Sequence, residues 1–218
     1  MASVRPNSAV RSIRGKSGDT NYAETPNGIE WKNNPIHTKP PTAAQIAQRA
    51  RLKAAGAAFR LLTPAQNAQW QAYALTYTVK SKTDKAIHPS AYNAFAGLAT
   101  KFLAVNPTGT IPATSPVSSF GGDTIVVTAS GGAGLITFTA SAKNGTNVTT
   151  ELLIQKLANI NRKPTSAYPS RGFFAFPIGT LIKTVALVPG TYAAAYRFVN
   201  SATGQEVALV TLGVFTVS

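Results

Sequence analysis

The spacing of hydrophobic and polar residues changes twice along the chain. Residues 1–41 sustain neither a helical nor a strand period, residues 42–105 show helical spacing, and residues 123–218 alternate with a period of two. Residues 106–122 are rich in Pro and Gly, which is typical of a linker. The pattern therefore predicts an α+β protein in two parts, with an extended arm and a small helical bundle followed by an antiparallel β-domain.

Two helix starts share one pattern, Thr42-Ala-Ala-Gln45 and Thr63-Pro-Ala-Gln66, which is the spacing of a capping box. The first helix is expected to end near Leu62, and a third helix is expected from about Pro89. The first helix has a weak apolar face, made of Ile46, Ala50, Ala54, Ala57 and Leu61. The third has a strong apolar stripe, made of Tyr92, Phe95, Ala96, Ala99, Phe102 and Leu103.

Short alternating segments with turn residues between them fill the C-terminal part. Strands are expected at residues 125–128, 135–140, 150–157, 173–176, 181–187, 191–199 and 207–217. Gly213 is a candidate β-bulge in the last of these. Seven short strands in so few residues are typical of an antiparallel sandwich.

One motif adds a family resemblance to this β-pattern. Leu187-Val-Pro-Gly-Thr-Tyr192, followed by Tyr196, resembles the turn into the sixth strand of fibronectin type III and immunoglobulin-like domains. The resemblance implies an immunoglobulin-like β-sandwich in which Tyr192 is the tyrosine corner. The chain lacks the cysteine pair of antibody domains, because it contains no cysteine.

The net charge of +14 is concentrated in the N-terminal half. Residues 1–105 hold fourteen Lys and Arg against four Asp and Glu, whereas residues 106–218 hold seven against three. The candidate partner-binding cations are Arg5, Arg11, Arg14 and Lys16 in the arm and Arg49, Arg51, Lys53 and Arg60 in the first helix. For the helix, a solvated face, an acidic protein partner and nucleic acid all stay open.

Trp31 is the one large apolar side chain in the arm, within a candidate short strand at residues 29–32. Two interpretations are open. Trp31 packs on the protein's own helices, or it anchors the arm in a neighbouring subunit, since Trp is enriched at the centres of interfaces.

The composition disfavours catalysis. The chain has no cysteine, two histidines and seven scattered acids, so neither a metal site nor a catalytic triad is indicated. We therefore expect no enzyme activity, no metal and no cofactor. No stretch approaches 18 apolar residues, so no membrane-spanning helix and no membrane partner are expected.

A second resemblance covers the N-terminal half. A basic arm precedes Pro-x-Thr-x-x-Gln with an Arg-rich helix, then Leu-Thr-x-x-Gln-x-x-x-Trp from Leu62 to Trp70, then Ser-x-Tyr-Asn-Ala-Phe from Ser90 to Phe95. This order resembles a group of uncharacterised proteins of tailed phages and prophages. It implies a virion structural protein, made in the host cytoplasm, which binds other phage structural proteins and forms homo-oligomers in the particle. The alternative is a DNA-binding or packaging-associated protein that uses the basic half.

Overall fold

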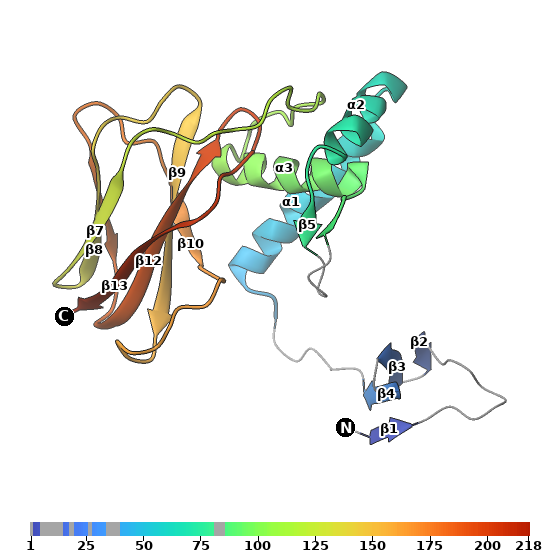
Figure 1. Ribbon diagram of the computed structural model, residues 1–218, viewed down its shortest axis with the longest axis horizontal. Helices are drawn as coiled ribbons and strands as arrows, with labels where there is room; N and C mark the ends of the chain where they lie inside the picture. Colours follow the sequence, from blue (N-terminus) through green and yellow to red (C-terminus); the bar gives the residue numbers. More distant parts are fainter. Residues whose placement is uncertain (1, 5–14, 18–19, 26–27, 34–39, 81–85) are drawn as a thin grey trace. The chain divides into compact units, whose positions relative to one another are not determined.

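The computed structural model describes residues 2–4, 15–17, 20–25, 28–33, 40–80 and 86–218 (Figure 1). These residues belong to two compact units, residues 1–45 and residues 46–218. The described part of the chain is α+β, with three helices and antiparallel sheets, as the sequence predicts.

The first unit contains a four-stranded antiparallel sheet with the order β1-β4-β3-β2. Its strands are β1 (Ala2–Val4), β2 (Gly15–Ser17), β3 (Thr20–Thr25) and β4 (Gly28–Asn33). This differs from the expected arm, for which only one short strand was predicted. Strand pairing uses backbone N–H and C=O groups, so polar segments that lack an apolar period can still form a ladder.

The second unit begins with three helices. They are α1 (Ala43–Arg60, whose first three residues fall in the first unit), α2 (Pro64–Ala74) and α3 (Ala91–Val105), as predicted. Their shared core contains Ala55 of α1, Trp70 and Ala74 of α2, and Phe95 and Ala99 of α3. Between α2 and α3 the structure describes the short pair β5 (Val79–Lys80) and β6 (Ala86–Ile87).

The apolar face predicted for α1 is wrong. Its members Ile46, Ala50, Ala54, Ala57 and Leu61 are all exposed. The helix instead packs through Ala55 and Phe59, whose ring centroid lies 5.4 Å from that of Phe95 and 5.3 Å from that of Tyr92. A phenyl ring removes more apolar surface from water than an alanine methyl group, and the contacts of Phe59 with Tyr92 and Phe95 place this face of α1 against α3.

Seven antiparallel strands follow, as predicted. They are β7 (Val127–Gly132), β8 (Leu135–Ala140), β9 (Val148–Leu157), β10 (Ser170–Phe174), β11 (Ile182–Ala186), β12 (Gly190–Asn200) and β13 (Val210–Val217). They form a three-stranded sheet, β11-β8-β7, and a four-stranded sheet, β10-β9-β12-β13. The predicted bulge is confirmed, because the register of β12 with β13 shifts beside Gly213.

The two sheets share one hydrophobic core. Phe138 of β8 and Ile154 of β9 are fully buried in it, together with Tyr192 and Ala194 of β12. Alternation along β8 explains the arrangement, because Ile136, Phe138 and Ala140 are buried while the residues between them are not. The β-part therefore obtains its core from both sheets.

The segment between α3 and β7 is attached to its surroundings. Trp70 Nε1 donates a hydrogen bond of 2.8 Å to the Ala113 carbonyl, and Asn106 Nδ2 donates one of 2.6 Å to the Ser201 carbonyl. At Gly204, in the loop between β12 and β13, an added Cβ would overlap the Leu98 carbonyl oxygen of α3. Helices and sheets thus meet closely within the second unit.

Candidate functional site

The exposed face of α1 gathers three of the predicted cations. Arg49, Lys53 and Arg60 are exposed, whereas Arg51 is half-buried. At roughly 100° per residue, the first three fall within about 40° of one another around the helix axis. No Asp or Glu occurs anywhere in α1. The helix therefore presents a positive ridge that no acid of its own neutralises.

Aliphatic side chains flank this ridge. Ile46 is 55% exposed and Leu61 is 84% exposed on one side of it, and Leu52 is 48% exposed on the other. The exposed alanines of the wrongly predicted apolar face lie on the same side as Ile46. We call the set of Ile46, Arg49, Leu52, Lys53, Arg60 and Leu61 the α1 face. The cations lie in the middle of this face, and the aliphatic side chains lie on either side of them.

Local sequence fixes where this helix begins. The backbone N–H of Thr42 donates to Gln45 Oε1 at 2.9 Å, and the N–H of Gln45 donates to Thr42 Oγ1 at 3.3 Å. Thr63 and Gln66 repeat the reciprocal pair at the start of α2. Both predicted capping boxes are confirmed.

The other predicted cations lie in the N-terminal segment. Arg5, Arg11 and Arg14 lie outside the described residues. Lys16 lies in β2, where its backbone pairs with Asn21. Trp31 lies in β4 opposite Tyr22 and Ala2, with 40% of its surface exposed. Both interpretations of Trp31 therefore remain predictions.

A buried charge cluster was not predicted. Glu151 of β9 has a side chain that is 3% exposed, and its Oε2 accepts from Lys101 Nζ at 3.0 Å and from Arg197 Nε at 2.6 Å. Glu206 bonds the same two cations, at 2.9 Å from Lys101 and 2.8 Å from Arg197. Two positive and two negative groups balance, so the cluster carries no net charge.

These contacts also set the protonation of Glu151. Burial by itself raises the pKa of this carboxyl, but the Arg197 hydrogen bond and the Lys101 charge outweigh it and hold the pKa below its ordinary value. The sequence did offer one signal, since Glu151 is a single acid inside the apolar strand β9. A buried carboxylate needs a cationic partner. The cluster joins α3 to the four-stranded sheet.

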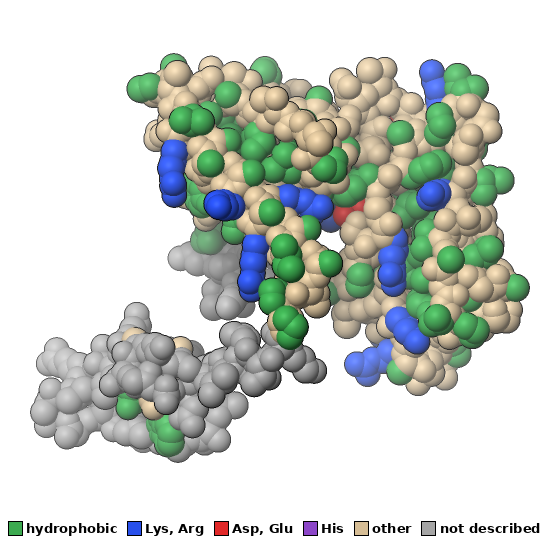
Figure 2. Space-filling view, turned by 180° about the vertical axis from the view of Figure 1, so that it is seen from behind, with side chains coloured by type: hydrophobic (Ala, Val, Ile, Leu, Met, Phe, Trp, Pro, Cys, Tyr) green, Lys and Arg blue, Asp and Glu red, His purple; other side chains and the backbone are tan. Residues whose placement is uncertain are grey.

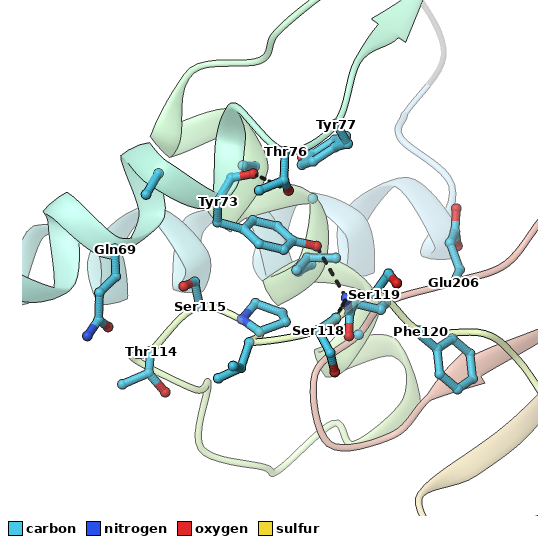
Figure 3. Close-up of a pocket in the computed structure, with 18 of the residues that line it drawn as sticks. Gln69, Tyr73, Thr76, Tyr77, Thr114, Ser115, Ser118, Ser119, Phe120 and Glu206 are labelled. Carbon is cyan, nitrogen blue, oxygen red and sulfur yellow. Dashed lines mark hydrogen bonds between the residues drawn. The ribbon is translucent and has the colours of Figure 1, made fainter.

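Beside this cluster lies a hollow of about 1180 Å³ (Figure 3). It is bounded by α2, α3, residues 114–120 and the loop before β13. Some of its polar groups bond to one another: Gln205 Nε2 donates to the Ser118 carbonyl at 2.9 Å and to Tyr73 Oη at 3.4 Å, and Thr76 Oγ1 donates to the Tyr73 carbonyl. Through its two bonds, Gln205 connects Ser118 of the linker to Tyr73 of α2.

Chemical groups for catalysis do not converge in the hollow or on the α1 face. Among the described residues, no three His, Cys, Asp or Glu side chains lie close enough to share a metal ion. None of the helices in that part of the chain is both long and apolar enough to span a bilayer. Figure 2 shows blue Lys and Arg side chains over both the helical part and the sheets, with one small red area in that view. The most distinctive surface is therefore cationic and partly aliphatic.

Neither the protein-family models nor the curated proteins compared with the chain gave a match.

Proposed function

We propose that this protein is a non-enzymatic structural component of a tailed-phage virion, associated with the head or the tail. It docks on other virion proteins through its basic N-terminal part and its helices. The observation that carries the proposal is the α1 face, where three exposed cations lie between exposed aliphatic side chains on a helix without acids. The sequence resemblance to phage proteins supplies the biological setting.

A surface of this kind favours protein contact. Scattered aliphatic side chains are normal on any surface, but here they flank a charged ridge along a single helix. Interfaces combine apolar contacts with charged groups that select the partner. An assembly protein needs such surfaces, and it needs no catalytic groups.

We further propose that the β-part is an immunoglobulin-like sandwich, as the Tyr192 motif implies. Counted from β7, the first, second and fifth strands of the β-part (β7, β8 and β11) share one sheet. The third, fourth, sixth and seventh (β9, β10, β12 and β13) share the other. This division resembles that of fibronectin type III domains. Tyr192 Oη donates a hydrogen bond of 2.8 Å to the Val188 carbonyl, four residues upstream, which supports the role of tyrosine corner. Such a domain serves as a spacer or a contact surface in the particle.

Particle composition tests the virion role. Purified particles from a host that carries the gene should contain the chain at a fixed copy number, measured by quantitative mass spectrometry. The triple variant Arg49→Glu/Lys53→Glu/Arg60→Glu should be depleted from particles. The matched control Lys143→Glu/Arg162→Glu/Lys163→Glu makes the same charge change at exposed positions of the β-part and should incorporate normally. Particles that lack the wild-type chain would rule out the role.

A further inference from the structure

We propose that the α1 face seats an acidic amphipathic α-helix of a second protein of the particle. This inference rests on the proposed virion role and names the chemistry of the partner. It starts from the finding that the apolar positions of α1 expected in the core are exposed. Ile46 and Leu61 lie at opposite ends of the helix, with the three cations between them in sequence.

Charge indicates an acidic partner. Arg49, Lys53 and Arg60 are exposed on a helix that has no acid. Residues 1–45 of the same chain do not complement them, because that segment has six Lys and Arg against three Asp and Glu. A second copy packed about a twofold axis would place the same cations opposite one another. Complementarity therefore favours a different chain that is rich in carboxylates.

Shape and apolar surface favour a protein over nucleic acid. Phosphate groups are satisfied by cations and polar donors, and they gain little from Ile46, Leu52 or Leu61. The three alanines at positions 50, 54 and 57 are exposed beside the cations and allow the backbone of another helix to approach closely. An α-helix of 18 residues also offers a partner helix a straight surface of about 27 Å. The occupant that fits is a helix with carboxylates along one face and aliphatic groups beside them.

Synthetic peptides test this on the full-length protein. The probe is a fluorescent helical peptide with Glu at i, i+4 and i+7 and Leu beside these positions. The comparison probes are a scrambled peptide of equal composition, the same peptide with Lys in place of Glu, and a duplex DNA. Fluorescence anisotropy gives each affinity at several salt concentrations.

The expected result is selective binding of the ordered acidic peptide, at least about tenfold tighter than the scrambled one, a difference of about 1.4 kcal/mol. The triple variant Arg49→Glu/Lys53→Glu/Arg60→Glu should lose that binding and gain affinity for the Lys peptide. The variant Ile46→Ser/Leu61→Ser should weaken peptide binding and leave DNA binding unchanged. Both residues are exposed, so these changes should leave the fold intact. The Lys143, Arg162 and Lys163 reversal should bind the peptide like the wild type.

Several results would overturn the inference. They are absence of peptide binding, equal affinity for the scrambled peptide, or tighter binding of DNA that the Arg49, Lys53 and Arg60 reversal abolishes. Particle incorporation separates this inference from the proposed virion role. If the triple variant enters particles normally, the α1 face is not the docking surface, whereas the virion role stands. If the wild type is absent from particles, the virion role fails.

Discussion

Lys101 Nζ lies 3.0 Å from Glu151 Oε2 and so connects α3 to β9 across fifty positions of the chain. The carboxylate is buried, whereas the ammonium group keeps partial contact with solvent, with 18% of the side chain exposed. Arg197, from the neighbouring strand β12, completes the pairing of Glu151. The contact therefore couples the stability of α3 to that of the four-stranded sheet.

Glu151→Gln should destabilise the fold by about 2–3 kcal/mol, because two partly buried cations lose the more buried of the two carboxylates that pair with them. The measurement is urea unfolding followed by circular dichroism. Glu206→Gln is the matched control, because Glu206 pairs with the same cations but has a side chain that is 38% exposed. It should cost less than about 1 kcal/mol. Equal losses in the two variants would contradict the role assigned to burial.

Stability should fall in acid, and Glu151 should account for part of the fall. Its pKa in the folded protein lies below the ordinary 4.5. Its contribution to the free energy of unfolding is therefore complete above about pH 4.5. That contribution is lost as the pH falls through the lower pKa of the folded state. Asp123 acts in the same direction, because bonds from Gly145, Asn144 and Thr124 outweigh burial and lower its pKa.

Urea midpoints measured between pH 7 and pH 3 check this dependence. The wild type should lose stability mainly below about pH 4.5. The Glu151→Gln variant should have a flatter profile in that range, because its side chain cannot take up a proton. Parallel profiles for the two proteins would show that Glu151 is not responsible.

Gly204→Ala should separate the loop before β13 from α3. The residue has φ +78°, and a Cβ there would overlap the Leu98 carbonyl oxygen and lie 2.9 Å from the Phe102 nitrogen. We expect a loss of about 3 kcal/mol or more, measured by denaturant unfolding. Gly179→Ala is the control, since Gly179 has φ +86° with open space around it. It should cost only about 1 kcal/mol.

Tyr192→Phe should cost about 1 kcal/mol, because the buried ring stays and only the hydrogen bond to the Val188 carbonyl is lost. Thermal and urea unfolding measure the change. Tyr196→Phe is the matched control, because Tyr196 lies on the same strand in the same core but outside this corner. If both variants lose the same stability, the corner bond has no special role.

Phe59→Ala should destabilise the helical part by about 2 kcal/mol, because α1 packs on Tyr92 and Phe95 through this ring. Leu61→Ala, two positions later, should stay within about 0.5 kcal/mol of the wild type, since Leu61 is 84% exposed. Unfolding followed by tryptophan fluorescence reports on this core when both variants carry Trp31→Phe, which leaves Trp70 as the one tryptophan of the chain. A larger loss of stability for Leu61→Ala than for Phe59→Ala would instead support the apolar face predicted from the sequence.

Local signals were sufficient to predict much of this fold. Thr42 and Gln45 close a capping box because they lie one helical turn apart, so no distant residue is needed. The alternation in β8 likewise encodes a strand with one face in a core. Tyr192 reaches the Val188 carbonyl only four residues away. Each of these features depends on neighbours in the sequence.

Tertiary packing decided the rest. Phe59 and the alanines around α1 both offered apolar surface, and only the positions of Tyr92 and Phe95 determined which face was buried. The sequence shows Glu151 as an unusual acid in an apolar strand, but its partners Lys101 and Arg197 lie 50 and 46 positions away in the chain. Burial and pairing energies depend on which groups meet in space, and that information is not contained in any short window of sequence. For the same reason, the cations of the α1 face could be proposed from the sequence, whereas Ile46 and Leu61 joined them only because the structure leaves both exposed.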